Sequence, residues 1–311
     1  MSATPSSFVN RLLRASLVLP QGNFPGTNSN TLVLPAPGSP VGIRMSAKLT
    51  GAGNFTNTCK LDIFGMRQVD MNAVTVLWAP SKNSGVVPTG VVARAILTLE
   101  ALDNVTGNYL QVFQGQFQDA FPDYRDLPDV RLTLSAASGY GQQILSSAPS
   151  SFSGGVQIAD LCAQLAGKMG FSFENNGVTG SLNTPYLSGT LMDQFRQVCE
   201  AGNIDYYFDS KQMLIICPKN QPRQGKIAVV LSPSSGLRGY VSLARFGIEV
   251  DCLWNGAIEM ASPIIVQDSD VPGTNGNWYP FAFEHSLDSV KPQGLWFSHL
   301  QCAPFPSTVG Q

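Results

Sequence analysis

Apolar and polar residues alternate along much of the first half of the chain. In the segment GIRMSAKL, every second residue from Ile43 to Leu49 is apolar, with Arg, Ser and Lys between them. The same two-residue period is found from Val91 to Ala101 and in the segment DVRLTLSA. This period is typical of half-buried antiparallel strands. The runs TCKLDIFGM, AVTVLWAP and NYLQVFQGQF also have strand character, and Gly, Pro and Asn clusters separate them. We therefore expect an antiparallel β-barrel or β-sandwich in residues 1–150.

The period changes at about Gly155. In VQIADLCAQLAGKMG the apolar positions follow the three-and-four spacing of an amphipathic helix, and Gly170 is placed to end it. The expected buried stripe consists of Ile158, Leu161, Cys162, Leu165 and Met169.

A second helix is predicted from about Leu191 to Ala201. Thr190 with Asp193 resembles a capping box, and Gly202 ends the helix. Two short strands, IDYYF and QMLIICP, follow and are joined by a turn at Asp-Ser-Lys. Residues 151–219 are thus predicted to form a small two-helix α+β module inserted between β domains.

The polar stretch KNQPRQGK after this module is predicted to be a linker. Strand periodicity then returns, because Ile248, Val250 and Cys252 alternate with acidic residues. The dipeptide Asn275-Gly276 between SPIIVQD and WYPFAFEHSL predicts a hairpin with a two-residue turn. Residues 220–311 are therefore expected to form a second β domain, and the fold class is mainly β with an inserted α+β module.

Composition limits the classes of function. Only 13% of the residues are charged, with 19 basic and 21 acidic residues. The chain therefore lacks the excess of basic charge that binds nucleic acid without sequence preference. A near-neutral surface suits assembly into a larger body. No signal peptide is apparent, and no window approaches the roughly 20 apolar residues of a membrane span. We expect a protein without a membrane anchor, made in a host cytoplasm.

Candidate chemical groups are few. The six cysteines are scattered, mostly in apolar runs, and are expected to be small buried hydrophobes: Cys59, Cys162, Cys199, Cys217, Cys252 and Cys302. His299 and Cys302 have the spacing of half a metal site, but no second Cys/His pair stands nearby. His285 follows Phe281 and Phe283 on a predicted strand and is interpreted as structural, because no adjacent nucleophile is suggested.

One acidic cluster, in DAFPDYRDLPD, is the remaining candidate for catalysis. Its four carboxylates belong to Asp119, Asp123, Asp126 and Asp129. A pair of carboxylates would serve glycoside hydrolysis, but this spacing in a proline-containing loop does not define the distance between them. An ordinary solvated turn is therefore favoured. Phosphate-loop, serine-hydrolase and zinc-protease motifs are not found in the sequence. We predict no catalytic, cofactor-binding or metal-binding residue and no cofactor.

Three stretches resemble the baseplate hub proteins of contractile-tailed bacteriophages, the tail-tube-adaptor hub family that includes late-control-protein-D-like proteins. Residues 60–75 are similar to its early strand-plus-loop segment. Residues 156–171 with 185–219 resemble its inserted module, and residues 246–270 with 275–304 resemble its closing β domain. Together they cover more than half of the chain, in the family's order.

This resemblance implies two tube-like β domains flanking the module, and a homotrimer with a pseudo-sixfold face. Duplicated domains would let three chains match a sixfold tail tube. The implied partners are the tail tube or a distal tube protein, the central spike and other baseplate proteins, with DNA or a tape-measure protein only passing through the channel. The implied location is the baseplate of the virion tail, and the implied role is structural rather than enzymatic.

Two other classes of function stay open. Small α+β units of this type also resemble the periplasmic rings of secretin pores, so another structural component of a tail or a secretion apparatus is the first alternative. Such ring proteins carry a secretion signal and tandem copies of the module, which this sequence does not show. A tail-associated cell-wall hydrolase is the second alternative, and it would need a catalytic carboxylate or a metal centre.

Overall fold

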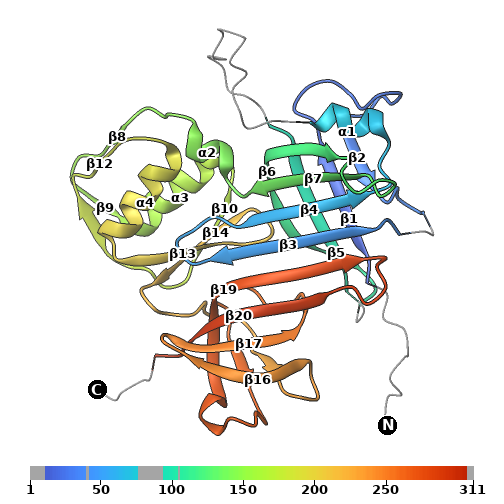
Figure 1. Cartoon of the computed structure of the whole chain (residues 1–311). Coiled ribbons are helices and arrows are strands. Elements are labelled where there is room, and N and C mark those ends of the chain that lie inside the picture. Colours follow the sequence, from blue (N-terminus) through green and yellow to red (C-terminus); the bar gives the residue numbers. More distant parts are fainter. Residues whose placement is uncertain (1–10, 40–41, 76–93, 104–105, 307–311) are drawn as a thin grey trace.

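The computed structural model describes residues 11–39, 42–75, 94–103 and 106–306. Figure 1 shows two β regions with a mixed helical module on one side. The first β region contains the short helix α1 (Gln68–Val74) and seven strands: β1 (Leu13–Val18), β2 (Thr31–Leu34), β3 (Met45–Ala52), β4 (Thr58–Phe64), β5 (Ile96–Leu102), β6 (Tyr109–Asp123) and β7 (Arg131–Ala137).

The closing β region, in orange and red in Figure 1, follows the module in sequence. It contains six strands and one 3-10 turn, η1 (Pro272–Thr274). The strands are β15 (Val229–Leu231), β16 (Leu237–Ala244), β17 (Gly247–Leu253), β18 (Ile264–Val266), β19 (Gly276–Ser289) and β20 (Trp296–Pro304).

The two β regions share one 13-stranded sheet, in which β3 pairs antiparallel with β19 from Ala52–Ala282 to Met45–Ser289. The main path runs β16-β17-β20-β19-β3-β4-β7-β6-β5-β1-β2. A β-barrel or a β-sandwich was predicted; within the described ranges this path has two ends, so a closed barrel is not formed. The domain boundaries after residues 150 and 219 stay predictions, since the sheet continues from one β region into the other.

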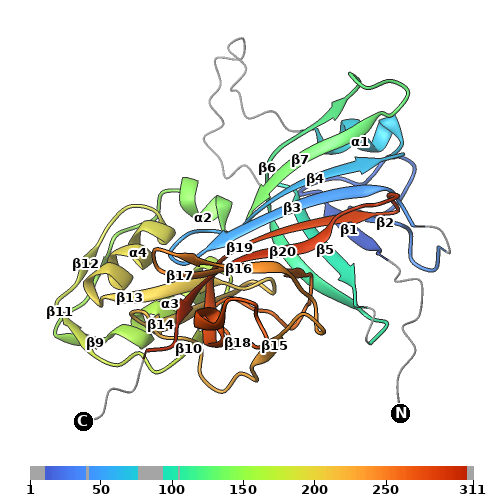
Figure 2. The same ribbon diagram turned by 60° about the horizontal axis from the view of Figure 1, so that its bottom comes forward.

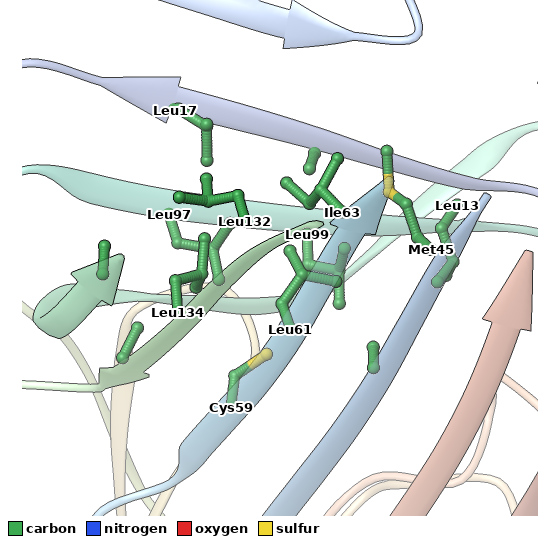
Figure 3. Packing of buried hydrophobic residues seen from close by; sticks show 14 of the residues in the cluster. Leu13, Leu17, Met45, Cys59, Leu61, Ile63, Leu97, Leu99, Leu132 and Leu134 are labelled. Atoms are coloured by element: carbon green, nitrogen blue, oxygen red, sulfur yellow. The ribbon is translucent and has the colours of Figure 1, made fainter. Parts of the chain in front are cut away.

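The core of the first β region confirms the predicted alternation. Met45, Ala47 and Leu49 are buried, and neighbouring strands contribute side chains in register to the same core. Figure 3 shows ten of these residues interdigitating between strands: Leu13, Leu17, Met45, Cys59, Leu61, Ile63, Leu97, Leu99, Leu132 and Leu134. The apolar alternation therefore fixes which face of each strand points inward.

Two predicted strand segments are not found as predicted or lie partly outside the described residues. The run AVTVLWAP was expected to be a strand, but Ala73 and Val74 belong to helix α1, whose Val74 and Met71 pack into the core. Residues 76–80 of that run, and Val91 and Ala93 of the second alternating run, lie outside the described residues.

The module confirms both predicted helices. Helices α3 (Ile158–Met169) and α4 (Leu191–Ala201) pack on a three-stranded sheet of β10 (Ser172–Asn175), β14 (Met213–Pro218) and β13 (Ile204–Phe208). Gly170 ends α3 in the left-handed conformation at φ +80°, and Thr190 forms a full capping box with Asp193. Shorter elements complete the module: α2 (Tyr140–Ile144), β8 (Ser150–Ser151), β9 (Gly155–Gln157), β11 (Ser181–Asn183) and β12 (Tyr186–Leu187).

The predicted hairpin between the strands on either side of Asn275-Gly276 is confirmed, but the prediction of a two-residue turn at this dipeptide is wrong. Strands β18 and β19 are antiparallel, but Val266 pairs with Gly276, so residues 267–275 form the connection. A hydrogen bond from the Ser269 amide to the Asn275 side chain and the turn η1 organise this longer loop. Asn275 has φ −69°, which the expected tight turn does not allow.

Candidate interaction surfaces

One face of the shared sheet is polar across both β regions. Lys48 on β3 lies beside Glu284 on β19, with Nζ 2.8 Å from Oε1, so an ion pair bridges the seam between the regions. In the registered strand pairs, residues opposite each other point to the same side of the sheet. The registers place these side chains on that side: Thr50, Lys60, Asp62, Thr133, Ser135, Glu249, Asp251, His299 and Gln301. On this side Asp62 lies 4.0 Å from Arg131 and Asp251 is bound to His299, whereas no ion pair of the described residues includes Lys60 or Glu249.

The acidic cluster predicted as a solvated turn is instead braced by arginines. Asp123, the last residue of β6, is buried and accepts hydrogen bonds from the Arg125 side chain and backbone and from the Arg131 side chain. The hydrogen bonds from Arg125 hold the pKa of Asp123 well below its usual range. Arg131 also contacts Asp126, at 3.1 Å. Each of these carboxylates is thus an acceptor in a structural network.

The other two carboxylates of the cluster have partners of their own. Asp129 pairs with Arg44 at 3.0 Å, and Asp119 accepts a hydrogen bond from Ser135. The turn between β6 and β7 is held by these ion pairs and hydrogen bonds, and its exposed large apolar side chains are Tyr124 and Leu127. A pair of free carboxylates facing a cleft, as glycoside hydrolysis needs, is not brought together by these four residues.

His285 is a buried side chain stacked on Phe283, with ring centroids 4.2 Å apart. Burial lowers the pKa of His285 to about 3, so the imidazole is neutral at ordinary pH. Its Nδ1 has no hydrogen-bond partner. No hydroxyl or thiol contacts the ring in the described hydrogen bonds, which agrees with the structural interpretation of this residue.

His299 and Cys302 do not come together. Both lie on β20, but His299 is on the polar face, where Nδ1 is 2.9 Å from Asp251, and Cys302 is fully buried in the core. Three residues apart on a strand, they point to opposite sides. Within the described ranges, no group of three or more His, Cys, Asp or Glu residues is arranged to hold a metal ion.

The cysteine prediction is confirmed, since all six cysteines are buried and unpaired. Burial raises the pKa of Cys217 and that of Cys252 to about 12. These thiols are protonated and unreactive at neutral pH, as expected of small core residues.

The segment predicted as a linker holds a buried arginine. Arg223 pairs with Glu174 of β10 (2.6 Å) and with Glu259 of the closing β region (2.9 Å), and only 1% of its side chain is exposed. Hydrogen bonding to Arg223 lowers the pKa of Glu174. Residues 219–226, predicted as a linker, therefore also fasten the module to the closing β region. A composition rich in Gln, Pro and Gly gave no signal of this contact.

The turn between β3 and β4 fastens the module to the first β region. The backbone amide of Asn54 donates to the Tyr206 carbonyl, and the Asn54 side chain accepts from the Tyr206 amide and donates to Asp205. The Tyr206 hydroxyl donates to the Asn54 carbonyl at 2.6 Å. The module is thus held on two sides and keeps a fixed position beside the sheet.

An aromatic groove of about 710 Å³ lies where the module, the β3–β4 turn and the closing β region meet. Phe55 and Phe246 line it and are both largely exposed. Four further aromatic side chains form its walls: Tyr207, Tyr279, Phe281 and Phe305. The sequence did not predict this groove, because its walls come from segments far apart in the chain.

Comparisons with known proteins agree with this architecture. A family model described as "Baseplate hub gp41" matches residues 39–294. No curated protein sequence matches the chain. Among the described residues, none of the helices is long and apolar enough to cross a membrane.

Solved structures share the fold at low sequence identity. A tail protein from Neisseria meningitidis MC58 superposes with a TM-score of 0.59 and 8% identity, over 94% of this chain and 96% of that one. The 43 kDa tail protein of prophage MuSo2 from Shewanella oneidensis superposes with a TM-score of 0.55 and 11% identity, over 84% of this chain and 96% of that one. The E. coli c3393 protein, described as a component of the type VI secretion system, superposes with a TM-score of 0.55 and 9% identity. The superposition covers 88% of this chain and 77% of that one.

Proposed function

The chain belongs to the baseplate hub gp41 family, and from this membership we propose that it acts as a homotrimeric hub joining the tail tube to the central spike. It is a structural component of a tail baseplate. The proposed partners are the tail tube or a distal tube protein, the spike and other baseplate proteins. In the assembled virion it lies at the baseplate.

The observation that carries this proposal is the seam between β3 and β19. Each chain presents two β regions side by side in one sheet, so three chains present six β regions. A threefold ring with this content can meet sixfold partners above and threefold partners below. A chain with a single β region would lack this property.

The polar face of the sheet is the proposed lining of the ejection channel. It crosses the seam at the Lys48–Glu284 pair, and it carries both acidic and basic side chains, so it is not a basic surface. A lining with little net field does not hold a passing polyanion, because nonspecific attachment of DNA depends on basic charge. DNA or a tape-measure protein would pass such a surface without being bound.

A non-enzymatic role is supported by the contacts of the four carboxylates in the acidic cluster. Its carboxylates are engaged by Arg44, Arg125, Arg131 and Ser135. The wall-hydrolase alternative is tested by incubating the purified protein with peptidoglycan and measuring soluble fragments. Release of fragments above that of a D123N variant would overturn the structural assignment.

The proposal is tested by the absolute mass of the purified protein. Multi-angle light scattering at several concentrations should give about 100 kDa, three times the 33.3 kDa of one chain. Negative-stain images of the same sample should show a ring with six lobes. A chain that stays at the mass of one subunit across the whole concentration range contradicts the homotrimer.

A further inference from the structure

Strand β16 is an exposed edge that carries large apolar side chains. Among the strands of the described residues it pairs with β17 alone, and the pairing is interrupted between Arg238 and Ser242. Tyr240, Leu243 and the adjoining Phe246 are 74%, 69% and 68% exposed. Soluble proteins usually protect such an edge with charge, proline or a covering segment, so an apolar open edge marks a binding surface.

Two arginines flank these apolar side chains. Arg238 lies over the Phe297 ring at 4.0 Å, and Arg245 lies near the Phe246 ring at 5.4 Å. No ion pair of the described residues includes either arginine, and Asp251, opposite Arg238 in the strand register, is bound to His299. We refer to Arg238, Tyr240, Leu243, Arg245 and Phe246 as the β16 patch. Arg238 lies on the polar side of the sheet, and Leu243, opposite Ile248, lies on the other side, so the patch extends around the open edge of β16. Arginine and aromatic residues are the types enriched at the centres of protein interfaces.

The partner of the β16 patch must supply carboxylates next to apolar side chains. Residues 227–248 contain no acidic residue, whereas residues 119–129 contain four aspartates and one arginine. We refer to residues 124–130, between β6 and β7, as the hairpin tip. There Tyr124 and Leu127 are exposed beside Asp126 and Asp129, whose side chains are 62% and 60% exposed. The two surfaces are complementary in charge and both expose apolar side chains.

The hairpin tip is prepared to receive further arginines. Asp126 and Asp129 each contact one arginine through a single carboxylate oxygen, and a carboxylate accepts up to about four hydrogen bonds. The network around Asp123 already holds the loop in one shape. Binding would therefore order few additional groups, which favours affinity.

The β16 patch and the hairpin tip of one chain lie on opposite sides of the β3–β19 seam. β16 is one end of the sheet path, whereas β6 and β7 lie beyond β3 and β4. Figures 1 and 2 both show them well apart. Contact between two different surfaces of identical chains is head-to-tail, and such contacts form a ring when the rotation between successive copies closes. We propose that the β16 patch of one copy binds the hairpin tip of the next copy, which makes this contact the subunit interface of the ring.

This inference rests on the proposed trimer, so its test must separate the interface from the assembly. The first experiment uses a full-length double variant, Leu127→Cys with Leu243→Cys, under mild oxidation with oxidised glutathione. Two thiols lose two protons and two electrons to the glutathione disulfide, which is reduced, and one disulfide forms. The native cysteines are buried and do not compete. Covalent dimers and trimers are expected on a non-reducing gel, whereas each single variant should remain a monomer there.

The second experiment reverses charge. The R238E/R245E variant should raise the concentration at which the trimer dissociates by at least about tenfold, because buried interface charges without partners are costly. Adding D126R to the same chain should recover part of the affinity. The matched control is Lys60→Glu, a charge reversal on the polar face away from both surfaces. Circular dichroism confirms that each variant is folded.

The outcomes distinguish the two proposals. A wild-type trimer in which the double-cysteine pair fails to cross-link, or in which R238E/R245E dissociates like K60E, overturns this interface and leaves the trimer standing. A wild-type chain that is monomeric at every concentration overturns the trimer and the interface together. Cross-linking that requires both cysteines, with loss of the trimer in R238E/R245E alone, supports the inference.

Discussion

Arg223 Nη2 lies 2.6 Å from Glu174 Oε2, inside a segment whose composition is that of a linker. The same guanidinium reaches Glu259 through Nη1, so one buried side chain connects the α+β module to the closing β region. A buried cation flanked by two carboxylates is sensitive to the loss of any member, because the remaining charges lose their compensation. The orientation of the module therefore depends on this contact.

Replacing Arg223 by Ala should destabilise the protein by about 3 kcal/mol, because two partly buried carboxylates would lose their buried cation. Glu174 would keep only its hydrogen bond from Asn176, and Glu259 only its contact with Lys226. Urea unfolding followed by circular dichroism measures the change. The matched control is Lys226→Ala, which removes one exposed contact to Glu259 and should cost less than about 0.5 kcal/mol. Equal losses in the two variants would contradict the role given to Arg223.

The stability of the wild type should fall as the pH is lowered from 7 to 5, in part because of His285. Its folded pKa, about 3, lies below the unfolded value near 6.5, so in this window the unfolded chain binds a proton that the folded chain does not. Stability contributed by the neutral ring is present above the unfolded pKa and decreases as the pH falls below it. The H285F variant should lose about 2 kcal/mol less than the wild type between these two pH values.

The measurement is the free energy of unfolding at pH 5 and at pH 7 for both proteins. His299→Gln, on the exposed polar face, is the control and should keep the contribution of His285. The same loss in H285F and in the wild type would show that this ring is accessible to protons in the folded state.

Thr190→Ala should destabilise the protein by about 1 kcal/mol, because the Thr190 hydroxyl accepts a hydrogen bond from the Asp193 amide at the start of α4. Thr190→Ser keeps the hydroxyl and should behave like the wild type. Thermal unfolding of the three proteins side by side is the test. A serine variant as unstable as the alanine variant would assign the effect to the lost methyl group rather than to the cap.

Gly247→Ala should destabilise the β16–β17 hairpin by more than about 1 kcal/mol. Gly247 has φ +149°, and a Cβ there would collide with the carbonyl oxygen of Cys302 on β20. Gly273→Ala is the control, because the added Cβ would meet no atom within 4 Å. The change is measured by urea unfolding, and a G247A variant as stable as G273A would show that the hairpin backbone can rearrange.

The fold was predictable from sequence where local patterns decide it. The apolar stripe of α3, the Thr190 capping box and the inward residues of β3 and β7 were identified, because each depends on neighbours a few residues away. The helix at residues 68–74 was missed, since a short apolar run cannot be assigned to strand or helix by period alone.

The parts that were not predictable depend on contacts between distant segments. The pairing of Lys48 with Glu284, the burial of Arg223 and the walls of the aromatic groove all join residues far apart in the chain. The acidic cluster was interpreted as a solvated turn, since its spacing does not show that Arg125 and Arg131 fold back onto it, and Arg44, the partner of Asp129, lies far away in sequence. Charged residues carry no periodic signal, so their partners become visible only in the folded chain.

The seam between β3 and β19 has a consequence for biosynthesis. β3 leaves the ribosome early, but its partner β19 is made only near the end of the chain. At about 5–20 residues per second, the β3 edge waits on the order of ten seconds or more with its backbone groups unpaired. During that interval the nascent chain exposes a strand edge that other chains can join. Translation speed and chaperone supply thus influence how much of this protein reaches its native form.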